Sequence, residues 1–318
     1  MKLYFAPMEG ITGYVFRNAH EKYFGAVERY YSPFISPTQH KCMNHREKND
    51  VLPAHNASIS LIPQVLTNQV KPFLDTAAAL QDMGYGEINL NLGCPSATVV
   101  TKGKGAGFLD RKDALHAFLD EVFAKCPIEI SLKTRLGMSR PEEVWELLLM
   151  FREYPIKEWI LHGRVREDFY NGKANRALFG EVLEQSRIPL CYNGDVATIE
   201  DYHKLQELFP KLQAIMIGRG LLANPSLARE IKGGMPITVG EFRAFQKEIC
   251  MGYKEIMSGE RNTLFKLKEL WSYWSRLFVG QEKEIKQVKK ASSVAAYLEA
   301  VDRVLPVEDC IYLPAKLL

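Results

Sequence analysis

Short β-rich runs alternate with helix-like segments through roughly the first three quarters of this 318-residue chain, and no other feature constrains its fold as strongly. Eight runs carry the β-branched and aromatic residues typical of strands. They span residues 3–8, 28–35, 60–66, 87–93, 128–136, 158–164, 188–195 and 214–220. Strands that alternate with helices pair in parallel and are buried on both faces. The pattern therefore predicts an α/β fold, a (β/α)8 TIM barrel, with a doubly wound sheet as the structural alternative.

The segments between these runs have helical periodicity. Val144, Leu147, Leu148 and Phe151 follow the i, i+3, i+4, i+7 spacing of one helix face. Pro72 suits the first turn of another helix. Residues 36–59 break the regularity, because they hold two prolines and three histidines with little periodicity. We expect a long loop there, with at most a short helix.

The strand signals stop after "KGGMP", residues 232–236. Thr238 and Glu241 then form a capping box that opens a helix. Helical stretches follow near 238–257, 261–279 and 284–304. We therefore expect two domains, a catalytic barrel over 1–236 and a helical bundle over 237–318.

Composition narrows the class of protein. The six cysteines are scattered without a C-x-x-C pair, which argues against a disulfide framework or a zinc site and for a reducing cytoplasm. No apolar run is long enough for a signal peptide or a membrane span. We expect a cytoplasmic monomer without a metal or a membrane partner. Most cysteines suit small buried positions, but Cys94 stands between a strand and a glycine-rich loop.

Polar or conformationally special residues occur at seven predicted strand ends. They are Pro7 and Met8, Gln64, Asn91 with Cys94, Lys133 with Arg135, His162 with Arg164, Asn193 to Asp195, and Gly218 with Arg219. Barrels of this kind place their active site at the carboxyl ends of the strands. Taken singly, each residue has a structural explanation as a turn residue or a satisfied core group. Their joint occurrence favours a functional site.

The last two strand ends suit a phosphate. "NGD" (193–195) and "GRG" (218–220) supply small residues whose backbone N–H groups can approach an anion, and Arg219 adds a fixed charge. Lys133 suits the N1/O2 edge of a flavin, with Gln64 at the opposite polar edge. A Schiff-base lysine of the aldolase kind, or a plain phosphate contact, are the alternatives for Lys133.

An ordered set of motifs resembles a known family. The set is "APMEGIT", "NLNLGCPS", "SLKTRLG", "LHGR" followed by "FYNGKAN", "CYNGDV" and "IMIGRGLLANP". In order and spacing it resembles the tRNA-dihydrouridine synthases. The resemblance covers the barrel and continues more weakly into the tail, where "FKLKELWSYW" is similar to the family's RNA-binding domain. The length of the chain and its tail resemble a bacterial member.

The resemblance implies an enzyme with bound FMN that reduces the C5–C6 double bond of specific uridines in the D-loop of tRNA, with NADPH as reductant. It implies that the flavin is lined by Pro7, Met8 and Glu9 and contacted at its ring by Gln64 and Lys133. The residues implied to hold its ring, ribityl chain or phosphate are His162, Asn193, Gly194, Asp195, Gly218 and Arg219. Those implied around the target base are Asn91, Arg135 and Tyr170, with Cys94 as the catalytic cysteine.

The chemistry gives Cys94 a specific role. Reducing uracil requires a hydride at C6, which FMN supplies, and a proton at C5. A thiol with the ordinary pKa of about 8.5 is mostly protonated at neutral pH and can act as a general acid. We expect Cys94 to donate this proton as a thiol. A packing role before Pro95 is the alternative.

Basic residues offer contacts to RNA. Lys102 and Lys104 lie in the loop "TKGKGAG", which can close over the base as a lid does. Between residues 261 and 290, eight cations face three acids, a local charge of +5 against +3 for the whole chain. The candidate RNA contacts in this stretch are Lys266, Arg276 and Lys286. A solvated charged face is the alternative.

Three other functions stay open at this point. One is a small-molecule flavin oxidoreductase of the dihydroorotate dehydrogenase type, which the basic tail disfavours. The others are a lyase that uses Lys133 covalently and a non-catalytic RNA-binding protein. The sequence does not predict which uridine is reduced.

Overall fold

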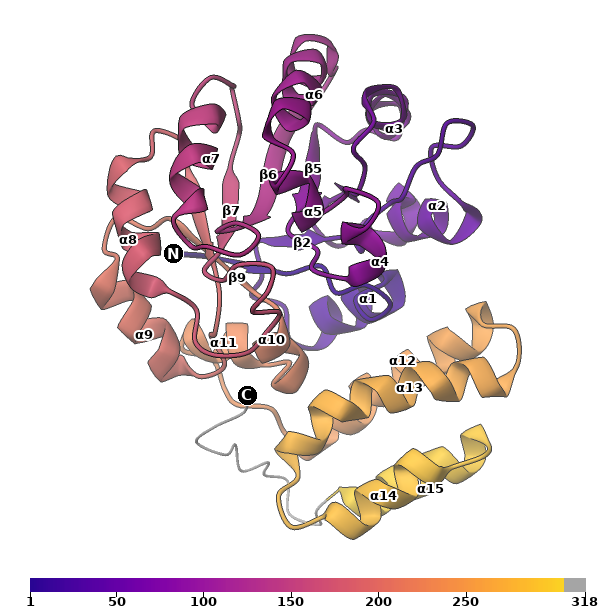
Figure 1. Cartoon of the computed structure of the whole chain (residues 1–318). Coiled ribbons are helices and arrows are strands. Elements are labelled where there is room, and N and C mark those ends of the chain that lie inside the picture. Colours follow the sequence, from indigo (N-terminus) through magenta and orange to yellow (C-terminus); the bar gives the residue numbers. More distant parts are fainter. Residues whose placement is uncertain (306–318) are drawn as a thin grey trace. The chain divides into compact units, whose positions relative to one another are not determined.

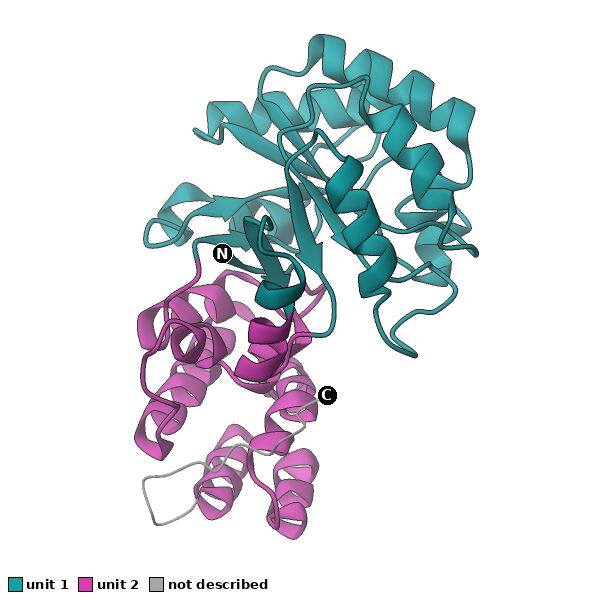
Figure 2. Ribbon diagram, turned by 90° about the vertical axis from the view of Figure 1, so that its left-hand side faces the viewer, with its two compact units in different colours: residues 1–7, 28–195, 205–216 teal, residues 8–27, 196–204, 217–318 magenta. Residues whose placement is uncertain are grey.

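The computed structural model describes residues 1–305, which form two compact units (Figure 2). The first unit comprises residues 1–7, 28–195 and 205–216, and the second comprises 8–27, 196–204 and the described chain from 217 on. Residues 306–318, which the sequence assigns to the helical domain and which include Cys310, lie outside the described residues.

A parallel sheet forms the centre of the first unit (Figure 1). Its strands are β1 (Lys2–Phe5), β2 (Arg29–Tyr31), β3 (Leu61–Ile62), β4 (Gln64–Val65), β5 (Glu87–Leu92), β6 (Glu129–Arg135), β7 (Trp159–His162), β8 (Leu190–Asn193) and β9 (Ala214–Ile217). They are ordered β3-β2-β1-β9-β8-β7-β6-β5-β4. The two outermost strands of this order, β3 and β4, are consecutive in sequence.

Pro63 explains why nine strands are found where the sequence predicts eight. Proline has no N–H to donate to a strand ladder, so it interrupts the predicted strand 60–66. The first half pairs with β2 through Tyr31 and Ile62, and the second pairs with β5 through Gln64 and Asn89. The two ends of the sheet therefore meet at Pro63, where the barrel closes. The (β/α)8 prediction is confirmed and the doubly wound alternative is excluded.

The barrel interior is filled with buried side chains. One cluster consists of Tyr4, Ala6, Tyr31, Ile62, Ile160, Cys191, Ala214 and Met216. Cys191 is completely buried, as expected for a cysteine that acts as a small apolar residue.

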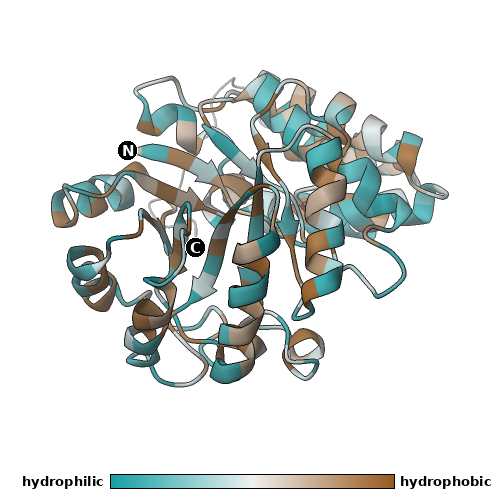
Figure 3. Cartoon of the chain, turned by 90° about the horizontal axis from the view of Figure 1, so that it is seen from above, coloured by the Kyte–Doolittle hydropathy of each residue, from teal (hydrophilic) through white to brown (hydrophobic). Residues whose placement is uncertain are grey.

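Helices surround the sheet in the first unit. They are α2 (His45–Val51), the 3-10 helix η1 (Pro53–His55), α3 (Val70–Asp82), α4 (Ala97–Val100), α5 (Ala106–Leu109), α6 (Lys112–Lys125), α7 (Glu143–Phe151) and α8 (Arg176–Gln185). The predicted apolar face of α7 is buried, and Pro72 lies in the first turn of α3. Brown and teal stretches alternate along such helices in Figure 3, which is typical of amphipathic helices. Helix α9 (Ile199–Leu208) spans both units.

The second unit is helical. Its helices are α1 (Tyr14–Tyr23), α10 (Arg219–Ala223), α11 (Leu227–Ile231), α12 (Val239–Ile256), α13 (Glu260–Trp274), the 3-10 helix η2 (Ser275–Leu277), α14 (Glu282–Lys290) and α15 (Val294–Val304). The capping box of Thr238 and Glu241 is present at the start of α12, as predicted. The single predicted helix 284–304 is wrong. The chain is extended at Ala291, and Ser293 caps a new helix by accepting from the N–H of Ala296.

Aromatic side chains make the core of this unit. Phe16 and Phe24, in and just after α1, pack edge-on against Phe245 of α12, with ring centroids 5.7 and 5.0 Å away. Trp271 and Trp274 are completely buried, so they serve packing. The indole of Trp271 donates to the hydroxyl of Tyr297 at 2.9 Å.

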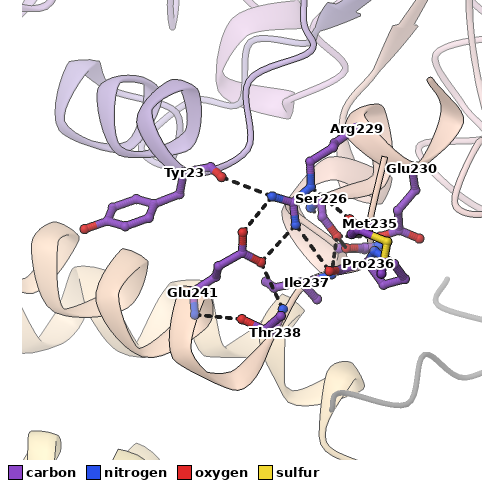
Figure 4. A network of polar contacts seen from close by, with 10 residues as sticks. Tyr23, Ser226, Arg229, Glu230, Met235, Pro236, Ile237, Thr238 and Glu241 are labelled. Carbon is purple, nitrogen blue, oxygen red and sulfur yellow. Dashed lines mark hydrogen bonds and ion pairs between the residues drawn. The ribbon is translucent and has the colours of Figure 1, made fainter. Parts of the chain in front are cut away.

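Arg229 connects α11 to the start of α12 (Figure 4). Its guanidinium donates to both carboxylate oxygens of Glu241, at 2.7 and 2.9 Å. It also donates to the carbonyl oxygens of Tyr23, Met235 and Pro236. One side chain thus binds α1, the connecting segment and α12.

Within residues 1–305, no helix combines the length and the apolar character needed to cross a bilayer. The same residues contain no group of three or more His, Cys, Asp or Glu side chains arranged to hold a metal ion.

Candidate active site

The register of the sheet brings predicted site residues side by side at the carboxyl ends of its strands. Asn91 of β5 pairs with Lys133 of β6, and Arg135 at the end of β6 pairs with His162 of β7. His162 pairs in turn with Asn193 of β8. Four adjacent strands therefore present these residues at one edge, where such barrels carry out their chemistry.

The loop that carries Cys94 is held from both sides. The side-chain oxygen of Asn91 accepts from the N–H groups of Gly93 and Cys94, at 3.0 and 2.9 Å. On the other side, the N–H of Ala106 donates to the Cys94 carbonyl at 3.1 Å. Gly105 has a φ of +55°, and a Cβ there would lie 2.9 Å from the Cys94 carbonyl oxygen. The glycine-rich loop is thus the surface against which the half-buried Cys94 packs.

A chain of hydrogen bonds continues from Asn91 into the barrel. Asn91 donates to Gln64 at 2.8 Å, and Gln64 donates to Asn89 at 2.8 Å. Asn89 donates to Ser131 at 3.0 Å, and Ser131 donates to Glu87 at 2.7 Å. Every bond donates toward Glu87. An ionised carboxylate only accepts, so Glu87 determines the orientation of each amide up to the Cys94 loop.

Gln64 lies within this chain and is completely buried, with both ends of its amide bonded. Its predicted contact with a flavin ring stays a prediction. Asn89, Ser131 and Glu87 were missed from the sequence. A signal for two of them was present, because residues 87, 89 and 91 are polar at every second position of a buried strand and so share one face.

Glu87 belongs to a buried charge cluster. It is 5% exposed and accepts from Arg29 at 3.3 Å. Arg29 also lies 3.8 Å from Glu158, which accepts from the hydroxyls of Tyr4 and Tyr31. Burial raises the pKa of Glu158. Arg29 is thus a counter-ion shared by the two carboxylates, and Lys157 lies 3.8 Å from Glu87 as a second cation.

Lys133 is a cation without a counter-ion. Its side chain is half-buried and makes no hydrogen bond or ion pair with another residue in the described part of the chain. Burial, and secondly the charge of Arg135, lower its pKa to about 8. An ammonium in this position favours an anionic or electron-rich ligand, because such a ligand would offset the cost of its burial. Lys133 therefore fits the edge of a flavin.

Arg135 joins two loops of the site. It is 1% exposed, and it donates to the carbonyl of Gly93 at 3.0 Å and to that of Val165 at 2.8 Å. Its guanidinium lies 5.4 Å from the ring centroid of Tyr170, which is 46% exposed. Arg135 thus connects the Cys94 loop to the loop after β7 and supports an aromatic ring at the surface.

Arg164 holds the loop after β7 through a second set of hydrogen bonds. This buried side chain donates to both carboxylate oxygens of Asp195, at 2.7 and 2.9 Å, and lies 3.2 Å from His162 Nε2. It also donates to the carbonyls of Asn171 and Gly172. Asp195, predicted to contact the cofactor, therefore has a structural partner, and its predicted role stays a prediction.

The segment after β8 packs closely against neighbouring side chains. A Cβ at Gly194 would overlap the hydroxyl of Tyr192 and lie 3.0 Å from the Ala174 Cβ, so only glycine fits. Asn193 donates to the carbonyl of Met216 at 2.8 Å. Both contacts are internal packing contacts, and the predicted phosphate contact stays a prediction.

The other predicted cofactor residues are described by their own surroundings. Pro7 ends the first segment of the first unit, while Met8, Glu9, Gly218 and Arg219 belong to the second. The N–H of Met8 donates to Thr12 at 2.8 Å, and Gly218 immediately precedes α10. The roles predicted for these residues stay predictions.

The predicted RNA contacts differ in exposure. Lys102 is exposed, whereas Lys104 is half-buried and has its pKa lowered by burial and by Lys102. Arg276 and Lys286 are exposed, but Lys266 donates to the carbonyl of Gly10 at 2.5 Å. Lys266 is thus engaged within its own unit.

The carboxyl ends of this parallel barrel carry the half-buried Lys133, the buried Arg135 and, on a loop, the thiol of Cys94. These groups define the class of protein as a (β/α)8 enzyme with its active site at that edge. The X-ray structure of an old yellow enzyme homologue from Zymomonas mobilis shares the fold. Its TM-score is 0.53 at 12% identity, covering 76% of this chain and 92% of that one.

The family model described as "Dihydrouridine synthase (Dus)" matches residues 4–299, and the chain belongs to this family. It is 28% identical to the tRNA-dihydrouridine(16) synthase of Pseudomonas syringae pv. tomato, over 73% of this chain and 74% of the relative. It is 29% identical to the tRNA-dihydrouridine synthase B of Pasteurella multocida, over 72% and 68%. The resemblance seen in the sequence is confirmed. The protein is an oxidoreductase acting on a carbon–carbon double bond, and the lyase alternative is excluded.

Proposed function

We propose that this protein is an FMN-dependent tRNA-dihydrouridine synthase that reduces uridines of the D-loop with NADPH. The observation that carries the cofactor assignment is Lys133, a half-buried cation without a counter-ion beside the Cys94 loop. The relatives' names supply the substrate, since they specify tRNA.

The cofactor would be held by residues of several strand ends. Lys133 and Gln64 would contact its ring, and Pro7, Met8 and Glu9 would line it. His162, Asn193, Gly194, Asp195, Gly218 and Arg219 would hold the ring, the ribityl chain or the phosphate. Bound FMN supplies the hydride that is added at C6 of uracil.

Cys94 would supply the proton. Its thiol donates a proton to C5 as the hydride reaches C6, and the thiolate regains a proton from solvent, so the base gains two hydrogens. Asn91 and Arg135 hold the Cys94 loop through Gly93 and Cys94, and this limits where the sulfur can lie. Asn91, Arg135 and the exposed Tyr170 would surround the extruded base.

RNA binding would involve both predicted domains, 1–236 and 237–318. A uracil in folded RNA must leave its stack before it can be reduced, at a cost of a few kcal/mol. Lys102 and Lys104 near the site, with Lys266, Arg276 and Lys286 in the tail, would hold phosphates while this happens. We place the reaction in the cytoplasm and expect a monomer.

The test is direct conversion. Purified protein is incubated with NADPH and unmodified tRNA, and the nucleosides are analysed by mass spectrometry. We expect dihydrouridine in the D-loop, and position 16 is inspected first because several relatives are named for it. Reduction of orotate without reduction of tRNA would instead indicate the small-molecule oxidoreductase.

A further inference from the structure

Phe169 has an unusual backbone and an exposed ring. Its φ is +51°, in the left-handed region that an aromatic residue rarely adopts, and its side chain is 41% exposed. Apart from Ala26, it is the only non-glycine residue with a positive φ among residues 1–305. Strain of this kind persists where the surrounding structure enforces it, and it concentrates at functional sites.

The loop around Phe169 enforces this conformation. The carboxylate of Asp168 accepts from the N–H of Val165 at 3.0 Å, and its carbonyl accepts from the N–H of Asn171 at 2.8 Å. The N–H of Phe169 itself donates to the carbonyl of Arg166 at 3.1 Å. These three hydrogen bonds hold the backbone turn that carries the exposed ring.

The guanidinium of Arg166 lies against this ring, and no carboxylate of the described chain neutralises its charge. Its guanidinium is 5.0 Å from the Phe169 ring centroid. Arg166 is half-buried and makes no ion pair or side-chain hydrogen bond with another residue of the described chain, and its Nε is buried without a partner. An exposed aromatic face beside an unneutralised cation matches the two parts of a nucleotide, a base and a phosphate.

The position of the pair connects it to the active site. Arg135 donates to the carbonyl of Val165, next to Arg166, and to the carbonyl of Gly93, next to Cys94. The residue after Phe169 is Tyr170, whose ring is supported by Arg135. The pair therefore lies on the loop joined to the one that carries the proton donor.

We propose that Phe169 and Arg166 form a nucleotide subsite for the RNA residue that flanks the target uridine. Its base stacks on Phe169 and its phosphate contacts Arg166. This inference rests on the proposed function. RNA is favoured because proteins that recognise single-stranded loops stack splayed bases on aromatic and arginine side chains. Holding a flanking base in this way would keep the target uridine out of its stack.

The ring is tested by three variants in steady-state assays with tRNA. Phe169→Ala should raise KM for tRNA about 5- to 150-fold, the range that the loss of one base stack gives. Phe169→Trp should restore it. Phe169→Gly should lose tRNA affinity as Phe169→Ala does, but keep its Tm within about 2 °C, because glycine accepts the left-handed backbone. Leu149→Ala, at an exposed apolar position of α7, is the matched control.

The cation is tested by salt dependence. Arg166→Gln should lower the slope of log K against log salt for tRNA binding by about 0.7, the value for one phosphate contact of a single strand. The control is Arg187→Gln, an exposed arginine that precedes β8 at the opposite end of the strands. Its slope should equal that of the wild type.

The nucleotide bound at this subsite could belong to the RNA or to NADPH, and the KM for NADPH distinguishes the two. KM for NADPH in the half-reaction without tRNA should be unchanged in every variant. A change confined to NADPH, or no change in either constant, would overturn the inference while a wild type active on tRNA leaves the proposed function intact. A wild type inactive on tRNA would overturn both.

Discussion

At the scale of single residues, Lys133 shows how position changes the properties of a common side chain. Burial and a neighbouring arginine lower its pKa to about 8. No acid offsets this within the described residues, although acids accompany the partly buried Arg29 and the buried Arg164. The lack of an acidic partner favours Lys133 as a residue that binds an anionic or electron-rich ligand.

The pH dependence of stability tests this property of Lys133 in the cofactor-free protein. Between pH 8 and 10.5, the unfolded chain retains a proton on Lys133 that the folded chain has lost. Stability must therefore rise with pH through this window, by at most about 3 kcal/mol. Urea unfolding should show the rise in the wild type, and Lys133→Met should lack it. Parallel pH profiles of the two proteins would contradict the shift.

Glu87 is expected to support the Cys94 loop from a distance. Glu87→Gln leaves Arg29 and Ser131 with an amide of undetermined orientation, so unfolding free energy should fall by about 2–4 kcal/mol. Reduction of tRNA by pre-reduced enzyme should also slow. Glu184→Gln is the control, since the side chain of Glu184 is 61% exposed and pairs with Lys211 at the surface. Equal stability of the two variants would show that the hydrogen-bond chain ends before Glu87.

Residue-level prediction from the sequence reached the strand ends and no further. Cys94, Lys133 and Arg135 were visible because each is chemically out of place where it stands. Ser131 was not, because its role depends on Asn89 across the sheet. Phe169 was not either, because a left-handed aromatic residue has no signature in the letters "DFYNG".

At the scale of elements, the segment between α11 and α12 determines how the helical tail begins. Arg229 binds Glu241 through two hydrogen bonds, and Glu241 also completes the capping box of α12. Both side chains are partly exposed, so the pair contributes modestly to stability. Its larger effect is on the direction in which α12 leaves α11.

Replacing Arg229 tests this connection. Arg229→Met should lower the unfolding free energy by about 1–2 kcal/mol and raise KM for tRNA, with kcat unchanged. Arg243→Met is the control, since its pair with Asp302 is 49% and 63% exposed and should contribute less than about 0.5 kcal/mol. If the two variants behave alike in both measurements, Arg229 has no special part in RNA binding.

Elements were predicted where local pattern determines them. All eight strands were found, because short strand-like runs that alternate with helical segments leave a strong signal. Pro63 divided one of them for a reason the sequence also contains, namely its missing N–H. The capping box of Asn44 and Glu47 that opens α2, and the break between α14 and α15, were missed. In both cases a short capping motif outweighed weak or misleading periodicity.

At the scale of the whole molecule, the barrel fold explains why the family's motifs are spread along the chain. A closed parallel barrel brings the ends of distant segments to one edge, which is why motifs scattered from β1 to β9 describe one function. The two compact units could not be predicted, because they depend on α1 packing with α12 through aromatic residues far apart in sequence. Charge behaves differently, since the basic stretch 261–290 is visible from composition alone.

The central claim, that Cys94 donates the proton to a base reduced at this edge of the barrel, is tested most directly by measuring two half-reactions with Cys94→Ala. We expect reduction of the bound flavin by NADPH to proceed at nearly the wild-type rate. We expect tRNA reduction by the pre-reduced variant to slow by about 10²- to 10⁴-fold, the usual contribution of a general acid. Equal losses in both half-reactions, or none in the second, would contradict the account.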